Sequence, residues 1–551
     1  MSPIPTTLLR VPPFPGSRAP SLVDAAASAG PRLSDAEVDR LIGRVVELQV
    51  GGNYWGSQPR TAESPYTLIR VTGSDWPAAA ADARPESTLV WRRSEPVDGA
   101  EQGDGRSCVV GPCDPWHLIR HAAEVIVDAD DELALIAAMA GIRVRCVGTG
   151  PFADLQTGGR AALRDAFRRC AGEVRHVSPF TGDPISVGEA VELCGLWRRL
   201  LDSNRCLTAA VGFAFWKQPT VAPLLWAGSG EVPFTSNPRA VQGGGRIAVW
   251  KSRTSASTMA ALQASGADLV EVEDGFLRSR GLGADCVPPL SIVVDQLGAH
   301  FDPGRPSELE MLLQGGNFGD ELLARAAQLR QVIVGSGLAK YEQSATVIER
   351  SAGSRRHILV PGQVEDDRSI LLGGCGLASN LDLLRRVREQ APEAYIIYKP
   401  HPDVVAGHRK GAVPNRICLQ YADQVADDLP IASLIDAVDE LHVNTSLAGF
   451  EALMRGKSVT TYGVPFYSGW GLTRDLGPVP SRRTAKRTVD ELVAATLLLY
   501  PRYLDPVTHL PCPAEIVVDR LIAGATRDTG LVVAMRRMQG RLKRELRRLA
   551  Q

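Results

Sequence analysis

From Arg246 onward, short apolar segments alternate with segments of helical composition, and this alternation restricts the fold to a parallel α/β architecture. Residues 246–250 and 268–273 have the composition of buried strands, with a helical segment between them. The same order returns at 357–362 and 394–400, which flank a second helical segment. Units of this βαβ kind form parallel sheets and place ligands at the carboxyl ends of the strands. We therefore predict two such sheets, one in each half of this region.

The length of the chain predicts several domains, because 551 residues exceed what one hydrophobic core can organise. Two stretches rich in Pro, Gly, Ser or Ala, 1–30 and 228–245, are typical of linkers. The expected division is a flexible segment at 1–30, a half-module at 31–227, a linker at 228–245, an α/β domain at 246–345, a second at 346–500, and a tail with a basic helix at 501–551.

The balance of charge excludes wholesale binding to nucleic acid. Lys and Arg number 61 and Asp and Glu 62, and no basic stretch is interleaved with aromatic residues. The ten cysteines include no C-x-x-C pair and no Cys/His cluster at ligand spacing, so we expect a reduced, metal-free protein of the cytoplasm. No apolar run reaches the length of a signal peptide or a membrane span. Any membrane contact is therefore expected to be peripheral.

Three pairs of segments repeat in the same order along the chain, which favours a duplicated domain. The pairs are 88–99 with 395–407, 123–152 with 439–466, and 179–184 with 506–511. The alternative is a chance likeness between two βαβ domains.

The first copy lacks the polar residues that distinguish the second. It offers Ser94 or Glu95 where the second copy has His401, and an acidic run at 128–133 where the second has a Thr-Ser turn. Acidic side chains would repel a phosphate group. We therefore predict that 31–227 is a degenerate copy of one Rossmann-type half-module and is not catalytic.

The segment 440–461 has the pattern of a strand, a polar turn, a helix and a second strand. Thr445 and Ser446 form the turn, and Gly456 stands where a helix C-cap is expected. Free backbone N–H groups and hydroxyls at such a turn bind anions. Glu451, in the first turns of the helix, is close enough to hydrogen-bond a sugar hydroxyl. The pattern indicates the donor pocket of a nucleotide-sugar enzyme.

Glu273 and Asp274 follow a predicted strand and precede Gly275, at the expected mouth of an α/β crevice. A carboxylate in this position can act as a general base or as a nucleophile toward an anomeric carbon. Arg278 and Ser279 supply a guanidinium and a hydroxyl for a substrate carboxylate or phosphate. The alternative is that these carboxylates are solvated loop residues.

His401 lies between Pro400 and Pro402 at the end of a predicted buried strand, and the two prolines fix its turn. The imidazole can donate a hydrogen bond to a leaving phosphate, and Lys399 can neutralise the phosphate charge. A purely structural histidine remains the alternative.

Two further segments contribute candidates. Gln363 follows the strand at 357–361 and is a candidate donor contact, while the acidic residues after it are expected to cap a helix rather than bind a metal. Tyr467 belongs to a Gly-rich aromatic loop that also holds Trp470 and Thr473, and this loop can close on a sugar or base. Core packing of the aromatic rings is the alternative.

Together these segments resemble the KpsC-type β-Kdo glycosyltransferases of capsule polysaccharide biosynthesis. The resemblance is carried by EDGFLRSRGLG, PLSIVVD, VPGQVEDD, YKPHPD, TSLAGFEAL, PFYSGWGLTRD, Arg482–Arg483 and YPRYLDP, and it extends from about 246 to 511. It implies a GT-B-like pair of Rossmann-type domains and CMP-Kdo as donor, without a metal. It also implies a lipid-linked, Kdo-terminated acceptor of the phosphatidylglycerol type and retention at the anomeric centre.

The resemblance also implies roles for the candidate residues. Asp274 would be the catalytic carboxylate, supported by Glu273, while His401, Pro402, Thr445 and Ser446 would bind the CMP phosphate. The remaining donor-site candidates are Glu451, Lys399, Arg278, Gln363 and Tyr467. Members of the family resemble two modules in tandem, whereas only one module is intact here, so we expect one type of linkage per chain.

Two other functions remain open at this stage. One is a GT-B transferase or epimerase that uses a UDP-sugar, and the other is a non-enzymatic scaffold within a capsule-assembly complex. Possible partners are capsule-assembly or export proteins and a second Kdo transferase. The basic helix near the C-terminus can rest on anionic lipid, which suits an enzyme on the inner face of the cytoplasmic membrane. Alternatively, it packs on the protein surface.

Overall fold

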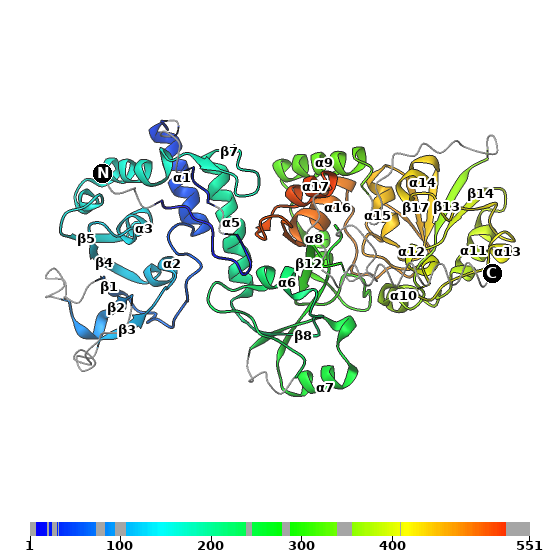
Figure 1. The fold of residues 1–551 in the computed structure, drawn as a ribbon, viewed down its shortest axis with the longest axis horizontal. Coiled ribbons are helices and arrows are strands. Elements are labelled where there is room, and N and C mark those ends of the chain that lie inside the picture. Colours follow the sequence, from blue (N-terminus) through cyan, green and yellow to red (C-terminus); the bar gives the residue numbers. More distant parts are fainter. Residues whose placement is uncertain are drawn as a thin grey trace. The chain divides into compact units, whose positions relative to one another are not determined.

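The computed structural model divides the chain into two compact units, coloured along the sequence in Figure 1. Unit 1 comprises 1–206 and 225–232, and unit 2 comprises 207–224 and 233–551. The structure describes residues 7–18, 21–24, 30, 32–72, 83–93, 106–237, 245–277, 287–338, 355–407 and 409–524. Arg278, Ser94, Glu95 and the basic helix near the C-terminus, all named from the sequence, lie outside these ranges.

Unit 1 is built on a parallel sheet with the strand order β3-β2-β1-β4-β5. A short antiparallel pair, β6 and β7, follows it in the sequence. In chain order the elements are α1 (Asp35–Leu48), β1 (Tyr66–Val71), the 3₁₀ turn η2 (Pro85–Ser87), β2 (Thr88–Arg92), β3 (Ser107–Val110), α2 (Pro115–Ile119), β4 (Ala122–Asp128), α3 (Leu133–Met139), β5 (Arg143–Val147), η3 (Ala153–Gln156), α4 (Gly159–Phe167), the π-helical η4 (Arg168–Gly172), β6 (His176–Val177), β7 (Pro184–Ile185) and α5 (Val187–Asn204).

Capping residues define the two long helices of unit 1. Ser34 precedes α1 and Ser186 precedes α5, and each accepts a hydrogen bond from the backbone N–H of a glutamate three residues on, whose carboxylate bonds back. These capping boxes satisfy backbone N–H groups that a helix otherwise leaves without partners.

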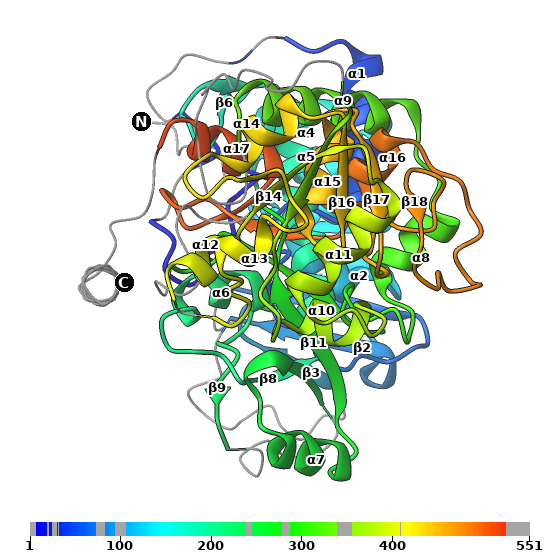
Figure 2. The same ribbon diagram turned by 90° about the vertical axis from the view of Figure 1, so that its right-hand side faces the viewer.

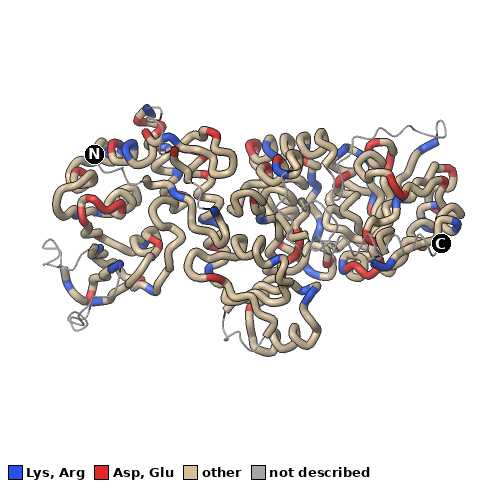
Figure 3. Tube along the Cα trace, viewed as in Figure 1, with Lys and Arg blue, Asp and Glu red and all other residues tan. Residues whose placement is uncertain are grey.

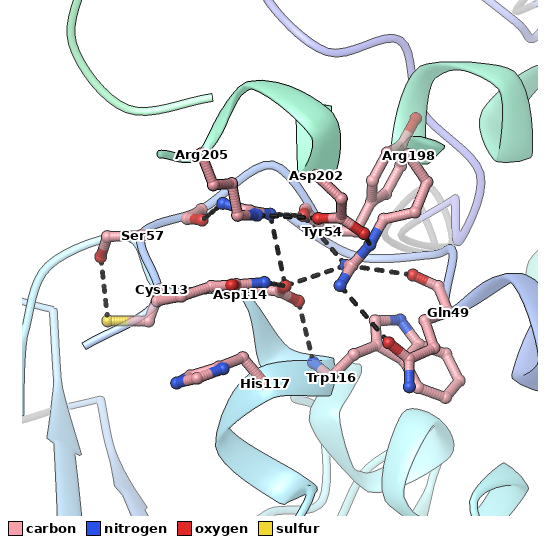
Figure 4. A network of polar contacts seen from close by, with 12 residues as sticks. Gln49, Tyr54, Ser57, Cys113, Asp114, Trp116, His117, Arg198, Asp202 and Arg205 are labelled. Carbon is pink, nitrogen blue, oxygen red and sulfur yellow. Dashed lines mark hydrogen bonds and ion pairs between the residues drawn. The ribbon is translucent and has the colours of Figure 1, made fainter. Parts of the chain in front are cut away.

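A buried ion network ties the loop after α1 to α2 and α5 (Figure 4). Asp114 caps α2 by accepting from the Trp116 N–H, and its carboxylate lies 2.9 Å from a guanidinium nitrogen of Arg198. Arg198, within α5, and Arg205, just after its end, also donate to the carbonyl of Tyr54. The buried carboxylate is thus surrounded by donors, as a charge removed from water requires.

Unit 2 contains two α/β domains, the first of which we call the acceptor-side domain. Its sheet has the order β20-β19-β12-β11-β10-β8-β9, parallel from β9 to β11 and antiparallel from β11 to β20. Its elements are β8 (Leu207–Val211), α6 (Gln218–Leu225), β9 (Phe234–Thr235), β10 (Arg246–Val249), η6 (Lys251–Arg253), α7 (Ala256–Ala264), β11 (Asp268–Asp274), β12 (Ser291–Asp295), α8 (Glu308–Gly315) and α9 (Asp320–Gly335).

The second domain of unit 2, the donor-side domain, has a parallel sheet in the order β15-β14-β13-β16-β17-β18. Figure 2 views this sheet with the labels of β14, β16, β17 and β18 in that order. Its elements are β13 (His357–Pro361), α10 (Arg368–Gly373), α11 (Asn380–Gln390), β14 (Tyr395–Lys399), α12 (Pro402–Val405), α13 (Asn415–Cys418), β15 (Gln424–Val425), α14 (Ile431–Ala437), β16 (Glu440–Val443), α15 (Leu447–Met454), β17 (Ser458–Thr461) and β18 (Arg474–Asp475). The helix α16 (Val489–Val493) and the π-helical η8 (Ala494–Leu499) follow and pack on α9 of the acceptor-side domain. The chain then returns to the acceptor-side sheet through β19 (Arg502–Leu504) and β20 (Pro511–Cys512), followed by α17 (Ala514–Ile522).

The predicted duplication is visible in the topology. The order β3-β2-β1-β4-β5 of unit 1 matches β15-β14-β13-β16-β17 of the donor-side domain, strand for strand and all parallel. In both copies a helix then runs into a π-helical turn, an antiparallel hairpin and a final helix. Unit 1 therefore repeats the donor-side half of a Rossmann-type module, as the sequence predicted.

The edge of the hairpin is covered in both copies. In the donor-side copy, β19 pairs antiparallel with β12. In unit 1 the extended residues around Val23 take the corresponding position, because Val23 pairs antiparallel with His176 and the Val177 N–H donates to Leu22.

The predicted boundary between the first half-module and the GT-B module is wrong by about one strand and one helix. We expected 31–227 to form the half-module, but β8 pairs in parallel with β10, and β9 pairs with β8. Residues 207–224 therefore belong to unit 2, and the expected linker at 228–245 contains a strand of its sheet. The apolar run at 207–211 is a buried strand whose partner lies beyond the Gly-rich stretch, which sequence order alone does not show.

Aromatic and ionic contacts are among those that join the domains of unit 2. Phe276, just after β11, packs with ring centroids 4.8 Å from Phe466 and 6.5 Å from Phe450 of the donor-side domain. Glu310 of α8 accepts from both Arg482 and Arg483, and Arg483 also donates to the carbonyl of Pro465. The two arginines recognised in the sequence thus fasten the domains together and do not line the cavity described below.

Lys and Arg are interspersed with Asp and Glu along the described chain (Figure 3), in line with its near-zero net charge. Within the part of the chain that the structure describes, no helix has the length and apolar character needed to cross a bilayer.

Candidate active site

A cavity of about 650 Å³ lies between the two domains of unit 2. The acceptor-side wall comes from the segment after β8, from the end of β10 and η6, and from the end of β11. The donor-side wall comes from the carboxyl ends of β13, β14 and β16 and the helices that follow. Its position at the carboxyl ends of parallel strands is where ligands of α/β sheets bind. The candidates that line it are Glu273, Asp274, Gln363, His401, Thr445 and Ser446.

The two candidate carboxylates are carried by the last residues of β11. Glu273 and Asp274 pair with Val293 and Ile292 of the antiparallel neighbour β12. Gly275 follows, and its N–H donates to the carbonyl of Ser291. A Cβ at Gly275 would lie 2.3 Å from the Ser291 hydroxyl, so only glycine lets the chain pass so close to β12.

Lys217 holds the carboxylate of Asp274. Its Nζ lies 2.8 Å from Oδ1 of Asp274 and 3.4 Å from the ring centroid of Trp250, which it covers. Lys217 is only 6 % exposed, so water screens this ion pair weakly. We did not predict Lys217 from the sequence, because it lies in the segment assigned to the degenerate copy. The signal that could have found it is the apolar run LTAAVGFAFWK, which has the composition of a buried strand that ends in a polar residue.

Glu273 is the partly buried neighbour of this ion pair. Burial raises the pKa of its carboxyl to about 7, and the negative charge of Asp274 adds to this rise, while Lys217 opposes it. Ser252 donates to Oε2 at 3.4 Å, whereas Oε1 accepts no hydrogen bond among the described residues. Two adjacent carboxyl groups thus have different environments, and such pairs divide the tasks of acid and base in many enzymes.

His401 is the N-cap of α12 on the donor-side wall. Its Nδ1 accepts the N–H of Asp403 at 3.1 Å. In the neutral ring the proton therefore resides on Nε2, so Nε2 is the donor atom of the ring. Proline at the first position of α12 suits the helix start, because that residue needs no backbone N–H.

The Thr-Ser turn lies at the N-terminus of α15. Ser446 caps the helix by accepting from Ala448, and Gly456 ends it with a φ of 71°. Gln363 bridges to this turn, because its amide donates to the Thr445 hydroxyl and accepts the Thr445 N–H, both at 3.0 Å. The turn therefore presents hydroxyls at a positive helix end, as predicted.

A second helix start, that of α10, faces the same cavity. Asp367 caps it by accepting the N–H and hydroxyl of Ser369, which confirms the predicted capping role of the acidic residues there. Arg368, at the first position of α10, also lines the cavity. Two helix N-termini and one arginine thus contribute positive potential to the donor-side wall.

Four expected donor contacts do not line the cavity. Lys399 is buried and donates to the carbonyl of Asp427. Glu451 is buried in α15, and Pro402 forms the first position of α12. Tyr467 is fully buried and donates to the carbonyl of Ser446, so it supports the turn from behind. We predicted that these four residues contact the donor directly, but they are not among the residues that line the cavity. Successive side chains at the end of a strand point to opposite faces of the sheet, so only some residues of each motif face the cavity.

The corresponding position of unit 1 is acidic and already engaged. At the end of β4, Asp131 accepts the Leu133 N–H and lies 3.5 Å from Arg70, while Glu132 pairs with Arg10. The acidic run that we predicted to exclude phosphate is thus bound by arginines of its own unit. Among the described residues of either unit, no group of three or more His, Cys, Asp or Glu side chains is placed to hold a metal ion.

Two Rossmann-type domains that face each other across a cavity, with anion-binding helix starts on one wall and carboxylates on the other, define the GT-B class of fold. Residues 246–503 match the model of the capsule polysaccharide biosynthesis protein family. This agrees with the resemblance noted in the sequence.

Curated relatives support the assignment. The chain is 40% identical over 353 residues to the capsule polysaccharide modification protein LipA of Neisseria meningitidis serogroup A, covering 63% of this chain and 50% of LipA. It is 48% identical over 256 residues to the lipopolysaccharide-processing protein LpsZ of Rhizobium meliloti, covering 46% of this chain and 58% of LpsZ. The chain therefore spans about half the length of the curated relatives it matches.

Two solved structures from Thermosulfurimonas dismutans are also similar. The chain is 33% identical to the KpsC β-Kdo 2,7 transferase, covering 58% of this chain and 99% of that one, with a TM-score of 0.47. It is 32% identical to the KpsC β-Kdo 2,4 transferase, covering 57% and 98%, with a TM-score of 0.49.

Proposed function

We propose that the protein is a glycosyltransferase that moves Kdo, with retention, from CMP-Kdo to a Kdo-terminated, lipid-linked acceptor of a capsular polysaccharide linker. The observation that carries the proposal is the single cavity shared by Asp274 and the turn of Thr445 and Ser446. A carboxylate facing an anion-binding wall suits the transfer of a sugar away from a phosphate. The sequence identity to two KpsC β-Kdo transferases supports Kdo as the sugar.

The donor-side wall would hold the CMP phosphate. The N-terminus of α15 and the hydroxyls of Thr445 and Ser446 offer donors, and Nε2–H of His401 offers another. As the glycosidic bond breaks, negative charge grows on the phosphate, and donors already fixed in place stabilise it. The arrangement needs no metal ion, in contrast to enzymes that clamp a diphosphate with Mg²⁺.

In the first step, a carboxylate oxygen of Asp274 attacks the anomeric carbon of Kdo. A C–O bond forms to Asp274, the C–O bond to the phosphate breaks, and its electron pair leaves with CMP. Lys217 pairs with the carboxylate of Asp274 and orients it before attack. The result is a glycosyl ester with inverted configuration.

In the second step, the acceptor hydroxyl attacks the same carbon and displaces Asp274, which restores the original configuration. The hydroxyl proton passes to Glu273, whose pKa of about 7 suits a general base. Two inversions give net retention, in the same manner as retaining glycosidases.

The role of unit 1 follows from its acidic site. Its strand ends carry bound carboxylates instead of a Thr-Ser turn, so we propose that unit 1 does not bind a nucleotide sugar. One working module per chain would then form one type of linkage. The acceptor, a partner protein or a second Kdo transferase are candidates for what unit 1 contacts, and the basic C-terminal helix is a candidate for contact with anionic lipid on the cytoplasmic face.

The test is a reaction of purified protein with Kdo, CTP, a CMP-Kdo synthetase and a synthetic Kdo-terminated acceptor, followed by mass spectrometry. Addition of one Kdo with a β linkage by NMR supports the proposal. Addition of several residues would contradict the inert role of unit 1. If calorimetry shows binding of UDP but not of CMP, the donor is a UDP-sugar and not CMP-Kdo. If neither nucleotide binds, the result favours a non-enzymatic scaffold protein.

A further inference from the structure

The environment of Lys217 is built to hold an ammonium group at the reaction centre. Phe213 packs edge-on against Trp250 with centroids 5.3 Å apart, and Nζ of Lys217 lies 3.4 Å from the Trp250 centroid and 5.3 Å from that of Trp216. Aromatic faces attract cations, more strongly where water is excluded. The backbone N–H of Lys217 also donates to Ala214, which fixes the turn before α6.

The donor class that the proposed function assigns has an unusual anomeric carbon. Kdo is a 2-keto sugar acid, so its anomeric carbon carries a carboxylate in place of the hydrogen of an aldose. When that carbon is within reacting distance of Asp274, its carboxylate is one bond further on. Reacting atoms lie roughly 3–3.5 Å apart, and Lys217 Nζ is already 2.8 Å from Asp274. Lys217 is therefore within reach of the sugar carboxylate.

Attack by Asp274 also changes the charge around Lys217. Before attack, the ammonium pairs with the ionised Asp274. Once the ester forms, Asp274 is neutral, and the buried ammonium loses the ion pair that it made with this carboxylate, which is costly. The sugar carboxylate supplies the replacement anion at the same step.

We propose that Lys217 recognises the carboxylate on the anomeric carbon of the donor and thereby selects a 2-keto sugar acid over an aldose. This inference rests on the proposed function. The ammonium exchanges Asp274 for the sugar carboxylate as the covalent bond forms. An aldose bound at the same phosphate site offers no carboxylate to replace Asp274 in this ion pair and would react slowly.

The other cationic side chains described along the cavity wall form no ion pair with Asp274. Arg253 lies over Trp216 at 5.8 Å on the acceptor-side wall, and Arg409 pairs with Asp366. Arg368 stands at the start of α10, on the donor-side wall with the phosphate-binding turn. Among the described cationic side chains of the cavity, Lys217 is the one in contact with Asp274, which places it for the substituent on the anomeric carbon.

The test uses the variant Asp274→Asn, whose neutral amide stands in for the ester and leaves the donor intact. Calorimetry compares its dissociation constants for CMP, which has no sugar carboxylate, and for CMP-Kdo. We expect CMP-Kdo to bind at least about 10-fold more tightly than CMP, as a charge-assisted contact predicts. In Asp274→Asn/Lys217→Met this preference should vanish while the affinity for CMP changes less than about twofold. Asp274→Asn/Lys217→Arg should retain part of it.

Lys251→Met is the matched control, because Lys251 makes a similar ion pair with Glu271 on the same strand but does not line the cavity. It should leave the preference for CMP-Kdo unchanged. If Asp274→Asn/Lys217→Met still binds CMP-Kdo more tightly than CMP, the inference about Lys217 is overturned, while the proposed function is unaffected. A parallel loss of CMP affinity and melting temperature would make Lys217 merely structural and would overturn it as well. If the wild-type protein binds neither CMP nor CMP-Kdo, the proposed function fails and the inference fails with it.

Discussion

Lys217 and Asp274 form an ion pair with 2.8 Å between Nζ and Oδ1, although 57 residues separate them in the chain. The lysine follows β8 and the aspartate ends β11, and β10 lies between these two strands in the sheet. The contact therefore depends on the parallel pairing of β8 with β10. It shows that the segment before the Gly-rich stretch belongs to unit 2, because this segment supplies a residue that contacts the carboxylate of Asp274.

Replacement of Asp274 should remove transfer without removing donor binding. We expect Asp274→Ala to lower turnover by about 10³-fold or more, since a covalent step loses its nucleophile. Affinity for CMP should remain within a few-fold, because the phosphate site is on the opposite wall. Kinetics and calorimetry on the same preparation check both parts, and unchanged turnover would remove Asp274 from the mechanism.

The pKa of Glu273 predicts the acid limb of the pH–rate profile. Below about pH 7 the carboxyl is protonated and cannot accept the proton of the acceptor hydroxyl, so kcat/KM should fall as pH decreases. Glu273→Gln should lower kcat by roughly 10²–10⁴-fold and abolish this limb. A limb that persists in Glu273→Gln would assign it to another group.

The same residue affects stability. The folded protein binds a proton at Glu273 more tightly than the unfolded chain does, because burial raises the pKa of this carboxyl from its ordinary value of 4.5 to about 7. Stability therefore decreases as pH rises from about 4.5 to about 7, by at most roughly 3 kcal/mol. Glu273→Gln should be the more stable protein above pH 7, and denaturant titrations at about pH 5 and pH 8 measure the difference. An equal effect at both pH values would argue against the raised pKa.

Two substitutions of His401 separate its role as helix N-cap from its role as a hydrogen-bond donor to the phosphate. His401→Asn keeps a good N-cap acceptor for the Asp403 N–H but removes Nε2–H, so CMP affinity should fall by about 10-fold with little loss of stability. His401→Ala should lose affinity and also about 1 kcal/mol of stability. An unaltered CMP affinity in both variants would remove His401 from the phosphate site.

Gly275 tests how closely β11 must approach β12. An alanine Cβ would lie 2.3 Å from the Ser291 hydroxyl, so Gly275→Ala should destabilise the protein by about 1–3 kcal/mol and shift Asp274 out of place. Gly335→Ala, at the end of α9, meets nothing within 4 Å and should be neutral or slightly stabilising. Thermal unfolding and turnover of both variants provide the comparison.

The arginine pair at Glu310 should differ in its contribution to stability. The side chains of Arg483 and Glu310 are 3% and 6% exposed, so Arg483→Met leaves a buried carboxylate short of one partner and should cost about 3 kcal/mol. Arg482 is 36% exposed, and Arg482→Met should cost less, about 1 kcal/mol. Equal losses in denaturant unfolding would show that burial does not decide the value of these contacts.

Local signals in the sequence were sufficient for much of the fold. Alternating apolar segments predicted β10, β11, β13, β14, β16 and β17. Ser446 and Gly456 marked the ends of α15, because N-cap hydroxyls and C-terminal glycines act through neighbouring backbone groups. The duplication was also predictable, since it preserves the order of strands.

Long-range contacts were the part that the sequence did not reveal. Nothing near Lys217 indicates that β8 adds to a sheet whose next strand lies beyond a Gly-rich stretch. The strand-end motifs correctly placed His401 and Thr445 at the cavity. They could not tell that Lys399 and Tyr467 lie behind its wall, because that depends on packing against distant segments.

The short pairing of Val23 with His176 protects the solubility of the protein. An uncovered strand edge offers a row of free N–H and C=O groups to any other chain and is a common start of aggregation. In the second copy the edge of the hairpin is permanently occupied by β12, a strand of a large sheet. In unit 1 the described residues around Val23 cover it through one short pairing, so displacement of this piece of chain would open a strand edge to other chains.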